Sequence, residues 1–71
     1  MTRQELEAAI ARLAEKREQC EAEARRYLER ETTGQGVFAA EIFELKQKKQ
    51  VLATEIRHLQ VKLNHLLLSW E

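Results

Sequence analysis

The segment Thr32-Thr33-Gly34-Gln35-Gly36 divides the chain into two nearly equal arms and decides its fold. It contains both glycines of the 71-residue sequence beside two β-branched threonines, and the chain has no proline anywhere. Glycine lacks a Cβ, so it readily adopts the left-handed conformation that ends many helices. We therefore expect Gly34 to cap one helix and Gly36 to act as the hinge that opens the next.

Both arms beside this segment have the composition of long helices. Every acidic residue is glutamate, charged residues make up 34% of the chain, and the remainder is rich in glutamine, alanine and leucine. These residue types have high helix propensity. Thr2 followed by Glu5 is typical of a capping box, which predicts a helix start next to Thr2. The aromatic content of 6% is too low for a large globular core.

Apolar residues recur in both arms at alternating spacings of four and three residues, which is the heptad pattern of a coiled coil. We call these positions the seam. In the second arm the pattern holds for ten consecutive positions, of which only Lys49 is charged, whereas in the first arm it weakens after Leu13. The seam residues are Leu6, Ile10, Leu13, Arg17, Cys20, Ala24 and Tyr27, followed by Phe38, Ile42, Leu45, Lys49, Leu52, Ile56, Leu59, Leu63, Leu66 and Trp70.

Two helices joined by about five residues pack as an antiparallel hairpin. The sequence therefore predicts an all-α fold, a coiled-coil-like antiparallel two-helix hairpin that assembles with partner helices. We expect one domain over 1–71, with helix one at about 3–32, a turn at 33–36 and helix two at about 37–70. Folding about the turn pairs Leu6 with Leu63, Leu13 with Ile56, Ala24 with Leu45 and Tyr27 with Ile42.

Two cations, Arg17 and Lys49, interrupt the seam. In the antiparallel register Lys49 lies close to Glu21. Arg17 has Glu18 and Glu55 as candidate partners. Long cationic side chains can lay their stems along an apolar seam while their charged ends reach water, and we favour this interpretation. The alternative is a polar role in setting the register of the two helices.

A second apolar group lies on the side of helix two that faces away from the seam. At about 100° per residue, Phe43, Val61 and Leu68 fall within one sector, and Val51 flanks it. A two-helix hairpin cannot bury both sides of one helix, so this group stays exposed unless a partner covers it. Scattered surface hydrophobes are the alternative explanation. The predicted partner-binding residues are Phe43, Val51, Val61, Leu67, Leu68 and Trp70.

Size and composition predict a protein that assembles with partners and resides in the cytoplasm. Chains below about 70–80 residues rarely gain much stability from one core, and Cys20 alone cannot form an internal disulfide. The first residues lack the apolar segment of a secretory signal. The longest run of large apolar residues, Leu66-Leu67-Leu68, is far shorter than the roughly 20 residues that span a membrane.

Motifs for catalysis or cofactor binding are scarce, so we expect neither an enzyme nor a cofactor. Gly34-Gln35-Gly36 lacks the third glycine and the preceding strand of a phosphate-binding loop. His58 and His65 are separated by about 10 Å along one helix face, too far to share a metal ion. Twelve basic residues balance twelve acidic ones, which disfavours nucleic acid as a partner.

The layout resembles the small helical-hairpin co-chaperones of the needle subunit in bacterial type III secretion. The likeness rests on the Thr33-Gly34-Gln35-Gly36 turn and the Leu52-to-Leu66 heptad run, and as a pattern it covers nearly the whole chain. It implies a bacterial cytoplasmic protein with a part in virulence. Such a protein binds a tetratricopeptide-repeat co-chaperone, and together they keep the needle subunit soluble before export.

The resemblance also implies where the repeat protein docks, namely on the side of Phe43, Val61 and Leu68 and at the end from Leu66 to Trp70. Needle subunits are small hairpins as well, but they have a proline-containing turn, which this chain lacks. An alternative function is a homo-oligomeric coiled-coil adaptor or scaffold without a secretion role. A hairpin that associates with RNA or DNA is disfavoured by the zero net charge.

Overall fold

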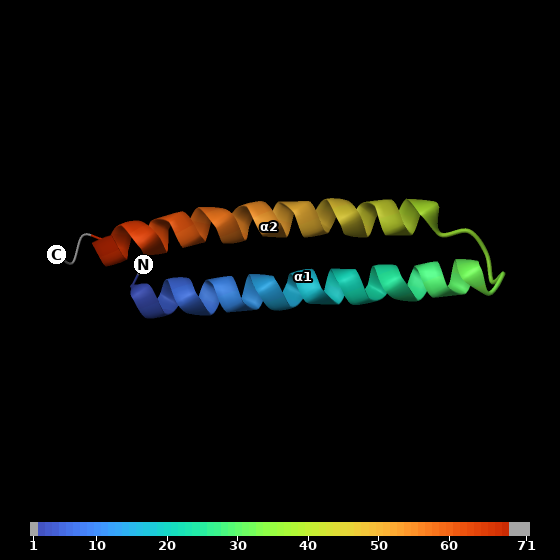
Figure 1. Ribbon diagram of the computed structural model, residues 1–71, viewed down its shortest axis with the longest axis horizontal. Helices are drawn as coiled ribbons and strands as arrows, with labels where there is room; N and C mark the ends of the chain where they lie inside the picture. Colours follow the sequence, from blue (N-terminus) through green and yellow to red (C-terminus); the bar gives the residue numbers. More distant parts are fainter. Residues whose placement is uncertain (1, 69–71) are drawn as a thin grey trace.

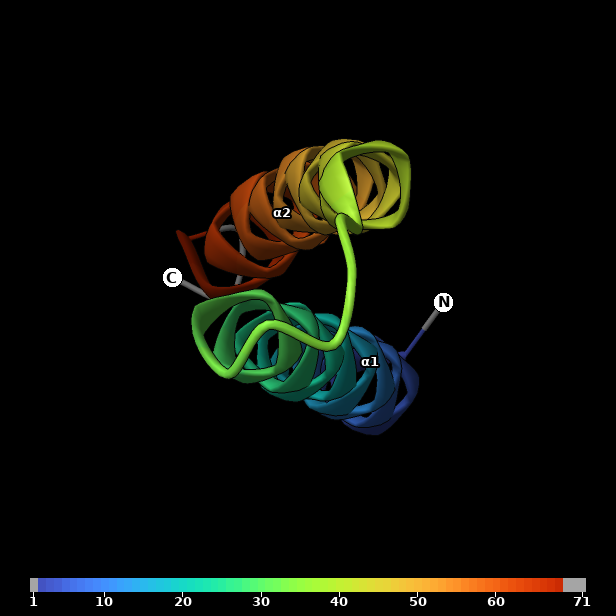
Figure 2. The same ribbon diagram turned by 90° about the vertical axis from the view of Figure 1, so that its right-hand side faces the viewer.

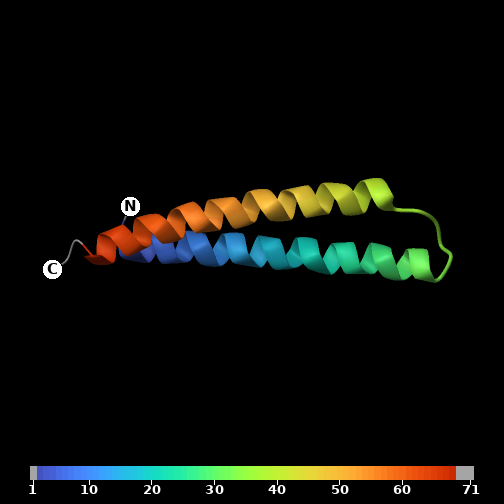
Figure 3. The same cartoon turned by 45° about the horizontal axis from the view of Figure 1, so that its top comes forward.

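The protein, seen in a computed structural model that describes residues 2–68, consists of two long helices. Helix α1 spans Arg3–Thr32 and helix α2 spans Ala39–Leu68. They lie side by side and antiparallel, joined by one connection at the far end of the rod (Figures 1 and 3). This arrangement confirms the predicted all-α hairpin, which measures 58 × 15 × 14 Å.

The helices cross obliquely instead of running strictly parallel, as the view from the connected end shows (Figure 2). A shallow crossing is what a heptad pattern requires, because about 3.5 residues per turn keep one strip of each helix on its neighbour only if the helices wind around each other. The seam therefore stays between α1 and α2 along the length of the hairpin.

The start of α1 is fixed by the predicted pairing of Thr2 with Glu5. The backbone N–H of Glu5 donates to Thr2 Oγ1 at 3.2 Å, and the Thr2 hydroxyl donates to a Glu5 carboxylate oxygen at 3.2 Å. The backbone N–H of Leu6 donates to the Thr2 carbonyl oxygen at 3.0 Å. The Thr2 side chain thus satisfies the Glu5 N–H, which has no acceptor within the helix.

The end of α1 is fixed by Gly34, which has a φ of +77° and caps the helix as expected. The backbone N–H of Gln35 donates to the Arg30 carbonyl at 2.9 Å, and that of Gly34 donates to the Glu31 carbonyl at 3.1 Å. These two bonds form a Schellman motif, which needs a left-handed residue at this position. Gly36 also has a positive φ, +135°, so both glycines turn the chain.

Helix α2 begins at Ala39, two residues beyond the expected boundary at 37, because a side chain from α1 holds the preceding residue. The backbone N–H of Phe38 donates to a Glu31 carboxylate oxygen at 2.6 Å. The Phe38 ring also packs on Tyr27, with 5.0 Å between ring centroids. The Phe38 carbonyl then accepts the first hydrogen bond of α2, from Ile42. The end of α1 therefore sets where α2 starts.

The core of the hairpin is small and lies along the predicted seam. Its buried apolar side chains, within the described residues, are Leu6, Ile42, Leu45 and Ile56. All other described seam positions are partly buried, except Lys49, which is exposed. The heptad pattern thus predicted which residues face the partner helix, and Lys49 marks the one place where the seam opens to water.

Candidate protein-binding site

The outer side of α2 carries large apolar side chains that hairpin packing leaves in solvent. Every predicted partner-binding residue that the structure describes is exposed, whereas Trp70 lies outside the described residues. The exposed fractions are 60% for Phe43, 58% for Val51, 49% for Val61, 42% for Leu67 and 71% for Leu68.

These residues do not form one continuous patch. Phe43 lies near the loop, about 37 Å from Leu68 along α2 at 1.5 Å per residue. Val61 and Leu68 are one heptad apart, so they lie on the same line along the outer side of α2, with Leu67 beside them. Val51 is rotated by about 100° around α2 from Phe43. The set therefore divides into a loop-end residue, a cluster near the end of α2, and Val51 alone.

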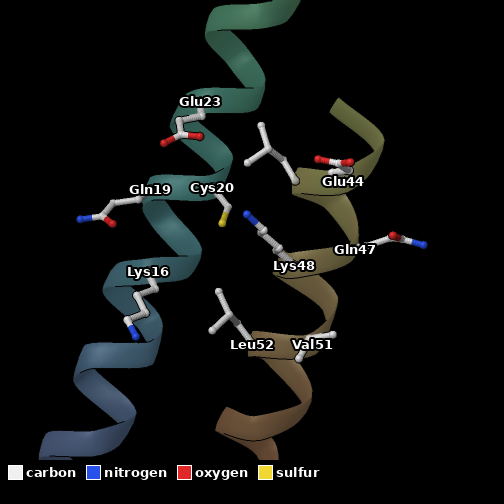
Figure 4. Close-up of a pocket in the computed structure, with 10 residues that line it drawn as sticks. Lys16, Gln19, Cys20, Glu23, Glu44, Gln47, Lys48, Val51 and Leu52 are labelled. Atoms are coloured by element: carbon white, nitrogen blue, oxygen red, sulfur yellow. The ribbon is translucent and has the colours of Figure 1, made fainter. Parts of the chain in front are cut away.

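Val51 borders a groove between the two helices, which we call the central groove (Figure 4). Its volume is about 640 Å³. Cys20, Lys48 and Leu52 point into the space between the helices, whereas Gln47 points away from it (Figure 4). The apolar lining is Cys20, Leu45, Val51 and Leu52, and the polar rim is Lys16, Gln19, Glu23, Glu44, Gln47 and Lys48.

The central groove forms because the middle of the seam is underfilled. Cys20 offers only a small side chain at the level of Lys49, and Lys49 leans to the opposite flank of the hairpin. There its Nζ lies 2.9 Å from Glu21 Oε1, which confirms the predicted proximity of these two residues. Nothing from Lys49 therefore covers the groove, and Cys20 with Leu52 is left partly exposed along its floor.

The Lys49–Glu21 contact also shifts an acid–base equilibrium. The hydrogen bond from Lys49, followed by the positive charge of that residue, lowers the pKa of Glu21 from its ordinary value of 4.5. Arg17 is partly buried and forms an ion pair with neither Glu18 nor Glu55. Its position fits the interpretation in which the stem of the cation follows the seam.

We expect a small loss of stability in acid from this pair. Because the pKa of Glu21 is lower in the folded chain, its contribution is present above the unfolded-state pKa and disappears as the pH falls through the folded value. Thermal unfolding of the native chain and of Glu21→Gln, followed from neutral pH to below the carboxyl range, should converge at low pH. A constant difference across that range would contradict the assignment.

Several exposed or groove-lining residues were not anticipated as surface features. Cys20, Leu45 and Leu52 were placed in the seam only, although the small residues Cys20 and Ala24 opposite Leu45 already signalled a gap. Leu28 and Val37, at the loop end, are 48% and 84% exposed. The sequence already indicated that both are exposed, because Leu28 lies off the heptad positions and Val37 lies in the connection between the helices.

The described part of the chain holds neither a metal-binding cluster nor a membrane-spanning helix. Among residues 2–68, no three histidine, cysteine or acidic side chains gather closely enough to hold a metal ion. Neither α1 nor α2 has a stretch apolar enough to cross a lipid bilayer. The chain matches no protein-family model, no curated protein and no solved structure.

Proposed function

We propose that this chain is a protein-binding hairpin and, more specifically, a bacterial cytoplasmic co-chaperone of a type III secretion needle subunit. The observation that carries the proposal is the set of large apolar side chains on the outer side of α2, which the hairpin itself does not bury. The specific role is supported by the resemblance in layout, with its glycine-containing turn and long apolar heptad run in the second half.

The proposed mechanism is mutual burial, in which no covalent bond is made or broken. A tetratricopeptide-repeat chaperone has apolar helix faces at its ends that need covering, much as terminal repeats cap a solenoid. The contact would be supplied by Phe43 near the loop and by Val61, Leu67 and Leu68 toward the end of α2, because burying each side chain fully gains roughly 1.5–3 kcal/mol. The stabilised repeat protein would then cover the apolar faces through which needle subunits polymerise.

The test is co-expression with a tetratricopeptide-repeat co-chaperone and its needle subunit, followed by measurement of the dissociation constant. We expect Phe43→Glu/Leu68→Glu to weaken binding at least tenfold, because both charges would have to be desolvated in the contact. Gln50→Glu/Asn64→Glu is the matched control, since it adds the same charge at two exposed polar positions of α2. Equal affinity of the two double variants would refute this docking surface.

A further inference from the structure

We propose that the central groove is the interface through which two copies of this chain pair, face to face, as a four-helix bundle. The groove has an apolar floor at the middle of the hairpin, and Val51 stands 58% exposed on its edge. Of the predicted partner-binding residues only Val51 borders the groove, whereas Phe43, Val61, Leu67 and Leu68 do not line it. Pairing through the groove therefore leaves that docking surface accessible.

The hairpin exposes more surface than a compact protein of its mass, because it is a rod of 58 × 15 × 14 Å. The hairpin exposes 5840 Å². A folded monomer with a mass of 8.4 kDa exposes about 4,600 Å² on the usual scaling with mass. The excess of roughly 1,200 Å² exceeds the roughly 800 Å² that each partner buries in a standard interface. A second copy seated on one face therefore has the area of a standard interface available to it.

The charged rim of the groove is self-complementary. Each helix contributes one cation and one anion to it, namely Lys16 with Glu23 from α1 and Lys48 with Glu44 from α2. Within the described residues the ion pairs are Arg3–Glu7 and Lys49–Glu21, so none of these four rim charges is neutralised inside the hairpin. A second copy can supply the missing opposite charges.

The register shows which charges a two-fold axis would bring together. A two-fold axis along the hairpin lays α1 of one copy against α2 of the other, antiparallel. In this register Lys49 and Glu21 lie at the same height along the hairpin axis. Lys48 of one copy then lies within about 3 Å, measured along the axis, of the height of Glu23 of the second copy. Lys16 comes equally close to the level of Glu55 of the second copy. Every such contact occurs twice in the dimer.

A second copy fits this groove better than a strongly charged partner does. The chain has zero net charge, so two copies approach without long-range repulsion, and the rim alternates in sign instead of favouring an acidic or a basic ligand. A hairpin also offers two helices at once, which matches the two walls of the groove. Four antiparallel helices around a shared apolar centre are a common bundle architecture.

Sedimentation equilibrium of the purified chain at roughly 1–100 μM, with helicity recorded in parallel, tests the pairing. We expect a dimer that Val51→Glu weakens at least tenfold. Val61→Glu is the matched control, because it is the same substitution at an exposed valine of the same helix, outside the groove. Both variants should keep the helicity of the native chain, since neither valine is buried.

A charge exchange tests the symmetry separately. Lys48→Glu should weaken the dimer because it faces Glu23 of the second copy, and combining it with Glu23→Lys should restore the native dissociation constant. Cys20 gives an independent readout, since a bulky maleimide should modify this free thiol more slowly at concentrations where the dimer forms.

Three results would overturn the proposal. The first is a monomer across the whole concentration range. The second is a dimer that Val61→Glu weakens as much as Val51→Glu, which would place the contact on the outer side of α2. The third is a native chain that stays monomeric and whose binding to the helical-repeat partner is abolished by Val51→Glu. The groove would then be the site of that partner. Phe43→Glu/Leu68→Glu should still dimerise. The dimer can therefore be measured whether or not the proposed function holds, and the two proposals can fail separately.

Discussion

Replacing Ile56 with alanine is expected to remove about half of the stability of the hairpin. Ile56 is 6% exposed and lies near the middle of α2, where it is one of the few buried apolar side chains of the described residues. Isoleucine-to-alanine changes in cores cost about 2–5 kcal/mol. A chain of this length has roughly 4–10 kcal/mol in total, at 0.05–0.15 kcal/mol per residue. The loss is therefore about half of the total.

The measurement is thermal and urea unfolding followed by far-UV circular dichroism, at a concentration low enough to keep the chain monomeric. Val61→Ala is the control, because that valine is 49% exposed on the same helix and alanine has the higher helix propensity. The control should unfold close to the native chain. If both variants lost equal stability, burial in the seam would not be what makes Ile56 important, and the prediction would be wrong.

The fold could be predicted because its determinants are local or periodic. Thr2 with Glu5 marked one helix start, Gly34 marked a helix end, and the spacing of apolar residues marked the strip where the helices meet. The predicted start of α2 was two residues too early, because no local or periodic feature of the sequence sets it. It depends on the hydrogen bond from Phe38 to Glu31, which joins the two helices across the loop and has no periodic signature.

The candidate site was predicted only in part. Exposure of Phe43, Val61 and Leu68 follows from geometry, because a two-helix hairpin has nothing to place over the outer side of α2. Two features depend on how side chains fill the seam. These are the separation of the exposed residues into groups and the position of Val51 beside a groove. That filling was decided by the direction of the Lys49 side chain, and a sequence pattern contains no information on rotamers.

Lys49→Leu is expected to stabilise the hairpin, with an increase of about 1–2 kcal/mol in the free energy of unfolding. Leucine would extend the apolar series of α2 through its only charged position, and burial of a leucine gains roughly 1.5–3 kcal/mol. The lost ion pair with Glu21 is exposed, and such pairs contribute at most about 1 kcal/mol. Urea unfolding of both chains, at matched low concentration, measures the difference.

Lys62→Leu is the control, because it removes the same charge at an exposed position of α2 that lies off the seam and outside the central groove, and it should stabilise little. The gain from Lys49→Leu should come with a loss of specificity. A charged residue in an otherwise apolar seam destabilises every helix register that would bury it without a partner. In this hairpin only one register places Lys49 beside Glu21. Sedimentation of Lys49→Leu should therefore reveal species larger than those of the native chain. A more stable variant of unchanged mass would mean that Lys49 lowers stability without selecting the register.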